Sequence, residues 1–326
     1  MAAAMATAER LPGSGLELVR VSLAAEGGLP DTSIAYAPSL GCNLASFSVA
    51  GHEYLLGEER LDDAYRVLGT PILYPMPNRV REARFTFDGH RYAFAANNGP
   101  NFIHGLVRER AWETESPHHA PGSISVRARC AFAPGLPGFD LFPIRNTVEL
   151  TYTVSAGSVR LEFAVHNEDG TRRLPYGLGV HPYWRIPGSR QDVRIQVPAS
   201  GWMEAVDLLP TGRVLPPPQG PADLRQPTSL GALELDDVFC GMHEGTPMSA
   251  FYDDLGTRLR ISASDAFTHC VVFTPDARSF FCLENQTCST DAHNLHALGF
   301  GAAAHLSILD PGASASCWVQ YTVSTA

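Results

Sequence analysis

Apolar and polar residues alternate with a period of two along much of the chain. This spacing places one face of a β-strand in a hydrophobic core and the other face toward solvent. It is clearest in three stripes: Ile124, Val126, Ala128, Cys130 and Phe132; Val148, Leu150, Tyr152 and Val154; and Val159, Leu161, Phe163 and Val165. Because only residues 155–158 separate the second stripe from the third, these two are predicted to form a hairpin.

The same alternation predicts strands elsewhere. A second hairpin is expected around Asp88-Gly89, a dipeptide that tolerates the positive φ angles of a tight turn, with strands over 85–87 and 92–94. Other strands are expected at 193–197, 259–263 and 317–323. No stretch shows three clean turns of the helical period, so the sequence predicts an all-β fold, a large antiparallel sandwich.

Two proline-rich stretches, 134–143 and 210–227, interrupt the strand pattern. Strand signals of the same kind lie on both sides of each stretch, and neither has the composition of a flexible tether. We therefore expect two long loops within a single domain of residues 1–326, with residues 1–15 a candidate disordered N-terminal extension. Loops at the ends of the sheets would be available for a functional site.

Charge and composition exclude several classes of function. The formal net charge is −10 at pH 7 and the pI is near 5.6, which argues against nucleic acid and anionic membrane surfaces as partners. All 24 basic residues are Arg and the chain has no Lys, so Schiff-base, pyridoxal-phosphate, P-loop and kinase chemistry are excluded. No segment approaches the roughly 18 consecutive apolar residues of a membrane span.

The seven Cys are odd in number, contain no C-x-x-C pair and lie mostly within apolar runs. They are interpreted as reduced core thiols. The first ten residues lack the basic region of a secretory signal peptide. Both observations favour a cytoplasmic location.

Two candidate site residues lie in the first third of the chain. Arg79 follows the proline-braced segment 74–78, which would hold its side chain stiffly, although a surface ion pair would explain it equally well. His104 stands between apolar residues and Gly105, which permits a close approach of the backbone. A buried core histidine is the simpler interpretation of His104 on local sequence alone.

Titratable side chains also stand in apolar or proline-flanked surroundings further along. Pro182 favours an extended backbone at His181 and lacks a donor, so a strand should end there, with the imidazole facing a cleft beside the two aromatic rings that follow. Aromatic faces and polar groups together suit a sugar. Of Asp236 and Asp237 only one can face an inward site, because successive strand residues face opposite sides. Glu284 directly follows four apolar residues, which makes it the strongest candidate for catalysis.

Other signals are weak. His293-x-x-His296 and His118-His119 lack a Cys or carboxylate partner at a recognised metal-ligand spacing. The chain contains no G-x-S-x-G, G-x-G-x-x-G or H-E-x-x-H motif.

Taken in order along the chain, these places resemble the aldose 1-epimerase (galactose mutarotase) family. The motifs are Asn78-Arg79 before Asp88-Gly89 and Tyr92, Asn97, Ile103-His104-Gly105, Pro137-Gly138-Phe139, Gly179-Val180-His181-Pro182-Tyr183, Leu235-Asp236-Asp237-x-Phe239, Glu284-x-Gln286-Thr287 and Asp291-Ala292-x-Asn294. Each is short, so the resemblance rests on their order and spacing. It implies a twisted antiparallel β-supersandwich and an isomerase that interconverts the α and β anomers of a free hexose of the galactose or glucose type, without cofactor or metal.

The resemblance also implies roles for individual residues. It makes Glu284 the general base and His181 the general acid, and it assigns substrate binding to Arg79, His104 and Asp236. The family often has Asp-His-x-Phe where this chain has Asp236-Asp237-x-Phe239. The choice of Asp236 over Asp237 therefore depends on the register of the strand.

Interconversion of anomers requires residues of these types. Opening a pyranose ring removes the proton of the C1 hydroxyl while the ring oxygen accepts one, so a base and an acid must flank the hemiacetal. Two alternatives use the same residues. Asp236 and Glu284 could be the carboxylate pair of a carbohydrate hydrolase or lyase on a similar sandwich, and a non-catalytic sugar-binding protein would bind without turnover.

The expected partner is a monosaccharide, with no nucleic acid and no membrane, and the chain is expected to be a monomer or a homodimer. A phosphorylated sugar would have to be recognised by Arg, since Lys is absent. The preferred aldose is left open by the sequence.

Overall fold

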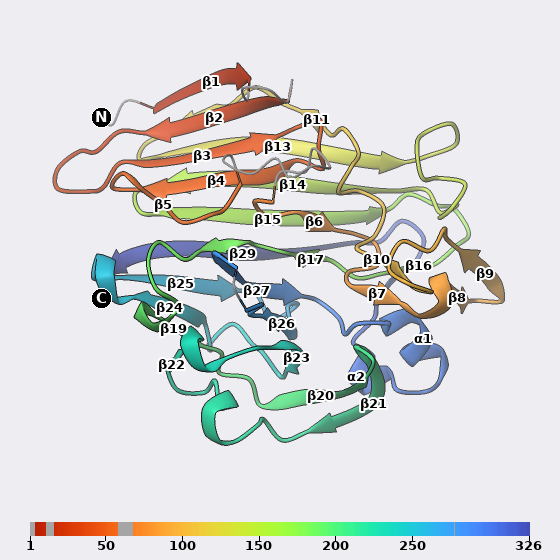
Figure 1. Ribbon diagram of the computed structural model, residues 1–326. Helices are drawn as coiled ribbons and strands as arrows, with labels where there is room; N and C mark the ends of the chain where they lie inside the picture. Colours follow the sequence, from red (N-terminus) through yellow and green to blue (C-terminus); the bar gives the residue numbers. More distant parts are fainter. Residues whose placement is uncertain (1–3, 11–15, 58–67, 277) are drawn as a thin grey trace.

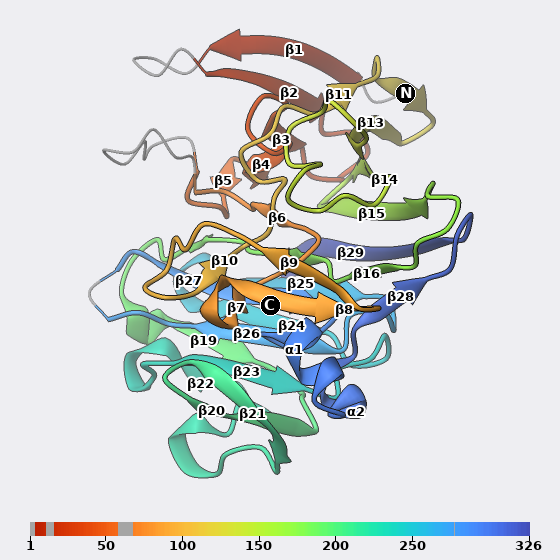
Figure 2. The same ribbon diagram turned by 90° about the vertical axis from the view of Figure 1, so that its right-hand side faces the viewer.

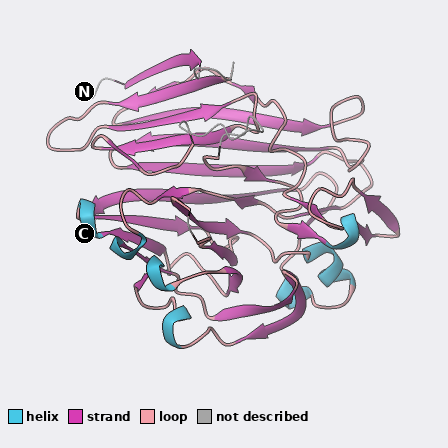
Figure 3. Ribbon diagram, in the orientation of Figure 1, coloured by secondary structure: helices cyan, strands magenta, loops and turns pink. Residues whose placement is uncertain are grey.

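The computed structural model describes residues 4–10, 16–57, 68–276 and 278–326. Every strand pairing in these ranges is antiparallel, and the architecture is the expected all-β sandwich (Figure 1). Strands dominate, while the helices are short and are spread over the lower half of the view (Figure 3). Two perpendicular views place the N-terminal strands at one end of the molecule and β20 (Gly201–Val206) and β21 (Leu209–Leu215) at the other (Figures 1 and 2).

The N-terminal sheet follows the order of the chain. Its strands are β1 (Ala4–Arg10), β2 (Glu17–Leu23), β3 (Thr32–Ala37), β4 (Asn43–Val49) and β5 (His52–Glu53). The expectation of a disordered extension is wrong for residues 4–10, which pair along their whole length with β2. Residues 1–3 and 11–15 of that predicted extension lie outside the described ranges.

The second sheet contains the longest strands. Its order is β11 (Glu113–Thr114), β13 (Ser123–Phe132), β14 (Asn146–Ser155), β15 (Ser158–Asn167), β29 (Ser314–Thr325), β25 (Thr257–Ala263), β24 (Met248–Tyr252), β19 (Val193–Gln196) and β22 (Thr228–Ser229), and β12 (His118–Ala120) also pairs with β13. Burial alternates residue by residue along β13, β14 and β15, as the period of two predicts. The predicted hairpin between 148–154 and 159–165 is confirmed.

The third sheet carries the candidate site. Its order is β21, β20, β23 (Asp236–Cys240), β26 (His269–Phe273), β27 (Phe280–Gln286), β17 (Gly179–Val180) and β6 (Ile72–Leu73), and β18 (Trp184–Arg185) also pairs with β27. Strands as far apart in the sequence as β6 and β27 therefore belong to one sheet.

Small elements complete the fold. The strand pairs are β7 (Arg79–Val80) with β10 (Phe102–Ile103), β8 (Arg84–Phe87) with β9 (His90–Ala93), and β16 (Leu174–Tyr176) with β28 (Ser307–Leu309). The β8–β9 pair confirms the hairpin predicted at Asp88-Gly89. Helices α1 (Ala292–Ala297) and α2 (Gly301–Ala304) have six and four residues, and no helix in the described ranges is long and apolar enough to cross a membrane.

One of the two expected loops is partly a strand. Residues 134–143 contain no strand, as expected, but β21 occupies the start of the stretch 210–227 and pairs with β20. The tight turn between them is formed by Asp207 and Leu208, both with positive φ, and it lacks the glycine that usually marks such a turn. Pro210 is tolerated because β21 is an edge strand, where a missing donor breaks no ladder.

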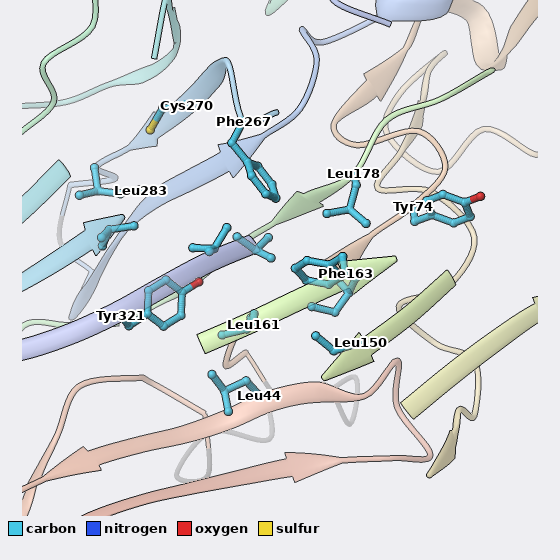
Figure 4. Packing of buried hydrophobic residues seen from close by; sticks show 14 of the residues in the cluster. Leu44, Tyr74, Leu150, Leu161, Phe163, Leu178, Phe267, Cys270, Leu283 and Tyr321 are labelled. Atoms are coloured by element: carbon cyan, nitrogen blue, oxygen red, sulfur yellow. The ribbon is translucent and has the colours of Figure 1, made fainter. Parts of the chain in front are cut away.

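A single buried hydrophobic cluster joins the three sheets. Leu44 of β4, Leu161 of β15 and Leu283 of β27 all belong to it and are fully buried. Figure 4 shows these side chains in the space between the strands, together with Phe163 and Tyr321. Burying a side chain of this size contributes about 1.5–3 kcal/mol relative to leaving it exposed. The cluster thus fixes the third sheet, and the site on it, against the longer strands.

Candidate active site

The five residues predicted from the sequence meet in one pocket of about 190 Å³. Its lining residues are Asn78, Arg79, Ile103, His104, His181, Tyr183, Asp236, Val271, Phe273 and Glu284. Residues up to 206 positions apart in the chain are brought together because β17, β23, β26 and β27 belong to one sheet, while β7 and β10 contribute residues of the same pocket.

Strand register sets the contact between His181 and Glu284. Gly179 pairs with Gln286, and Trp184 pairs with Phe281. Continuing that register across the short break at Pro182 puts His181 directly opposite Glu284, and directly opposed side chains are the closest neighbours in an antiparallel pair. The distance from His181 Nε2 to Glu284 Oε1 is 3.1 Å. Both side chains line the same pocket.

The break at Pro182 orients the residues around it. The His181 N–H donates to the Pro71 carbonyl at 3.1 Å, so the strand remains attached on its other side. The ring of Tyr183 stacks on the His181 imidazole, with centroids 4.6 Å apart and planes 17° apart. The expectation of two aromatic rings in the cleft is wrong for Trp184, which is buried in the core and packs edge-on against Tyr321 at 4.7 Å.

Burial shifts the acid–base balance of the pair. Glu284 is 2% exposed, and burial, together with the charge of Asp236, raises its pKa well above the ordinary range. Gln286 opposes this shift by donating from Nε2 to Glu284 Oε2 at 3.2 Å. Burial lowers the pKa of His181 to about 4. Both groups are thus disfavoured as separate ions, and the pair is held close to a neutral state.

His104 approaches from β10 in an unusual backbone conformation. Its φ is +72°, and the following Gly105 has φ +70°. A Cβ atom at Gly105 would lie 2.3 Å from the Tyr74 carbonyl oxygen, so only glycine fits there. The His104 ring lies edge-on to His181 with centroids 5.2 Å apart. Burial and the neighbouring His181 lower the pKa of His104 well below its ordinary value, so its imidazole is neutral at pH 7.

Three acceptors hold the Arg79 guanidinium. Nε donates to Asn98 Oδ1 at 3.1 Å, and Nη1 donates to Asn78 Oδ1 at 3.2 Å. Nη2 lies 3.5 Å from Asp236 Oδ2. Asn78 Oδ1 also accepts from the Arg79 N–H at 2.8 Å, which ties the side chain to its own strand. The planar guanidinium is therefore fixed in the pocket wall before any ligand arrives.

The two adjacent aspartates of β23 face opposite sides. Asp236 lines the pocket, whereas Asp237 Oδ1 accepts a hydrogen bond from Trp202 Nε1 at 3.0 Å. Burial raises the pKa of Asp237. The structure thus places Asp236 in the site, as the resemblance suggested, and gives Asp237 a separate partner.

Sequence reasoning missed residues that complete the site. Val271 and Phe273 of β26 form an apolar wall, and they pair with Glu284 and Cys282 across the β26–β27 ladder. Val271 and Phe273 are two residues apart on the strand next to β27, so the period of two could have placed both side chains on one face. Gln286 could have been found as a neighbour of Glu284, because side chains two apart on one strand face the same side. No local pattern marks Asn98 as a partner of Arg79, because that contact depends on the folded arrangement.

Potential metal ligands also occur at this site. A nitrogen of His181, the sulfur of Cys282 and an oxygen of Glu284 lie within 4.8 Å of one another. The histidine pairs noted in the sequence are placed differently. His118 and His119 are exposed on β12, and His293 is buried with its ring stacked on Phe85 at 4.2 Å.

Sequence comparisons place the chain among sugar-converting proteins. The sequence model of the family described as aldose 1-epimerase matches residues 31–322. Galactose mutarotase of Sus scrofa is 29% identical over 159 residues, which are 47% of this chain and 44% of that protein. The uncharacterized protein YphB of Escherichia coli (strain K12) is 27% identical over 232 residues, 68% of this chain and 74% of that protein. The matched part spans about half the length of the galactose mutarotases.

Structural comparisons agree on the fold. A galactose mutarotase-like protein from Clostridium acetobutylicum superposes with a TM-score of 0.85 at 18% identity, covering 99% of both chains. Galactose 1-epimerase from Lactobacillus acidophilus gives a TM-score of 0.75 at 14% identity, also over 99% of both chains. At such identities the likeness establishes a shared architecture.

Proposed function

The chain belongs to the aldose 1-epimerase family, and from this premise we propose that it interconverts the α and β anomers of a free hexose of the galactose or glucose type. The observation that carries the proposal is the 3.1 Å contact between His181 Nε2 and Glu284 Oε1 at the wall of a pocket. A base and an acid at this separation can flank the two oxygens bonded to one anomeric carbon.

In the proposed reaction Glu284 removes the proton from the C1 hydroxyl while His181 protonates the ring oxygen. The C1–O5 bond breaks, C1 becomes an aldehyde, and rotation about C1–C2 presents its other face. Reclosure reverses both proton transfers and yields the other anomer. No atom is gained or lost, and the side chains regain their starting protons.

One mobile proton is enough for the whole cycle. Glu284 must start ionised and His181 protonated, and ring opening ends with a neutral carboxyl and a neutral imidazole. The raised pKa of Glu284 and the lowered pKa of His181 favour the second state in the empty pocket. A proton shift across their contact converts one state into the other without exchange with solvent, so both states are accessible near neutral pH.

We assign sugar binding and charge stabilisation to Arg79, His104 and Asp236. The neutral imidazole of His104 can donate to or accept from a hydroxyl, and the fixed guanidinium can donate to an oxygen that gains charge as the ring opens. Asp236 can accept hydrogen bonds from hydroxyl groups while keeping its contact with Arg79. Tyr183 and Phe273 supply aromatic and apolar surface for a sugar face.

Polarimetry tests the proposal directly. The protein is mixed with freshly dissolved α-D-galactose or α-D-glucose, and we expect optical rotation to relax to its equilibrium value faster than without protein. The same preparation should release no new reducing ends from an oligosaccharide. Relaxation at the solvent rate with both sugars would contradict the proposal, and sugar binding without acceleration would indicate a non-catalytic protein.

Asn98 is expected to act as a positioning residue for Arg79. Replacing Asn98 with Ala removes the acceptor at Nε and should lower kcat/KM for anomerisation about tenfold, since a hydrogen bond to a charged group contributes about 1.5–3 kcal/mol. Asn98→Asp retains an acceptor oxygen and should restore most of the activity. Equal losses in the two variants would show that Asn98 does not act through its hydrogen bond to Arg79.

We also propose a cytoplasmic location, which is supported by seven free thiols in the described residues. The single domain and the monomeric or homodimeric state remain predictions.

A further inference from the structure

The proposed reaction gives no role to Cys282, a fully buried residue two positions before Glu284 on β27. Side chains two apart on a strand face the same side, so the thiol and the carboxylate are neighbours on one face. Together with the His181 imidazole they form a group whose ligand atoms lie within 4.8 Å of one another. Three different donor types thus converge beside the pocket.

The spacing of these atoms is close to that of a zinc site. Tetrahedral Zn²⁺ with bonds of about 2.0–2.3 Å holds its nitrogen, oxygen and sulfur ligands about 3.3–3.6 Å apart. His181 Nε2 and Glu284 Oε1 are already 3.1 Å apart. The remaining separations, which are at most 4.8 Å, exceed the bonded spacing of sulfur to its neighbours by up to about 1.2 Å, a distance within reach of side-chain rotation.

The donor set also selects the ion. Thiolate, imidazole and carboxylate together suit Zn²⁺, whereas Mg²⁺ and Ca²⁺ prefer oxygen ligands alone. A thiolate and a carboxylate neutralise the two positive charges of Zn²⁺, so the filled site adds no net charge to a buried region. The adjoining pocket of about 190 Å³ supplies room for water as a fourth ligand.

We propose that His181, Cys282 and Glu284 bind one Zn²⁺ ion, and that this ion inhibits the protein. Binding forms bonds to Nε2, Sγ and a carboxylate oxygen, and two protons are released to solvent, one from the thiol and one from the His181–Glu284 pair. The ion then occupies the lone pairs on which Glu284 and His181 would carry the transferred proton. A chain with bound metal therefore cannot catalyse the proposed reaction. The ion-binding part stands without the proposed function, whereas the inhibitory effect rests on it.

Metal binding is tested without any activity measurement. The full chain, first treated with a chelator, is titrated with Zn²⁺ by calorimetry and with Co²⁺ by absorption spectroscopy. We expect one ion per chain and a thiolate-to-cobalt charge-transfer band. Cys282→Ser should abolish the band and weaken Zn²⁺ binding by at least about 10–100-fold, because loss of an outer partner alone costs this much.

Cys317→Ser is the matched control, since it makes the same chemical change at a half-buried thiol on β29. It should leave both the band and the affinity unchanged. A band that survives Cys282→Ser, cobalt bound without a thiolate band, or no binding at all would each overturn the site. Should Cys282→Ser fail to fold, X-ray absorption at the zinc edge of the wild-type protein must show one sulfur ligand.

Inhibition is measured separately by polarimetry. In the wild type, Zn²⁺ should slow anomerisation at the concentration that fills the site, and chelation should restore the rate. If anomerisation is absent, the proposed function fails while the cobalt spectrum still decides the metal site. Zn²⁺ bound through Cys282 without loss of activity would overturn the inhibitory role alone.

Discussion

Glu284→Gln is expected to lower kcat for anomerisation by about 10²–10⁴-fold, to near the solvent rate, while sugar binding survives. Glutamine matches glutamate in size and keeps an acceptor oxygen, but it cannot take a proton. Because burial already favours the neutral carboxyl, the neutral amide should not destabilise the fold. Polarimetry gives the rate, and calorimetric titration with galactose gives the affinity.

The control for this variant is Glu234→Gln, a change of the same kind at an exposed carboxylate just before β23. It should leave kcat and KM unchanged. Undiminished polarimetric activity of Glu284→Gln would remove this carboxylate from the mechanism, and loss of sugar binding with an intact circular dichroism spectrum would make it a binding residue.

His181→Asn is expected to lower kcat by about 10²–10⁴-fold with only a modest change in KM, because the imidazole acts mainly in the transition state. The pH profile separates this role from a structural one. Wild-type activity should fall as pH drops toward the lowered pKa of His181, about 4, since a second proton then blocks the base. It should also fall at high pH, where the pair loses its mobile proton.

In His181→Asn only the carboxylate titrates, so the residual rate should rise with pH through the raised pKa of Glu284. His166→Asn changes a partly exposed histidine near the end of β15, outside the residues that line the pocket, and should reproduce the wild-type profile. A change confined to KM, or an unaltered profile in His181→Asn, would make His181 a binding residue only.

Much of the fold follows from local pattern. The alternation over 148–154 and 159–165 predicts the β14–β15 hairpin because each apolar stripe must face one core. The turn at Asp207-Leu208 escapes prediction because neither residue is a typical turn former at positive φ. Strand β1 escapes it because its apolar residues are mostly alanine, which carries a weak strand signal.

For the site, the sequence predicts individual residues but not the contacts between them. Glu284 and His181 stand out because a titratable group in an apolar or proline-bounded strand must be paired or used. Their mutual contact cannot be read from either segment, since it depends on the alignment of β17 and β18 with β27. The clamp of Asn78 and Asn98 on Arg79 is likewise a property of the assembled sheet and loops.

The contact between His181 and Glu284 is set by the pairing register of two backbone segments. Substitutions therefore affect it differently from insertions and deletions. Substitutions of Val271 or Phe273 would alter the pocket wall and leave the two proposed reacting side chains in place, so we expect that sugar preference can change while the proposed chemistry is retained. One inserted or deleted codon within 179–185 or 280–286 would turn a reacting side chain to the opposite face of the sheet. We therefore expect related sequences to differ by substitutions in the pocket wall and to lack single-residue insertions or deletions in those two segments.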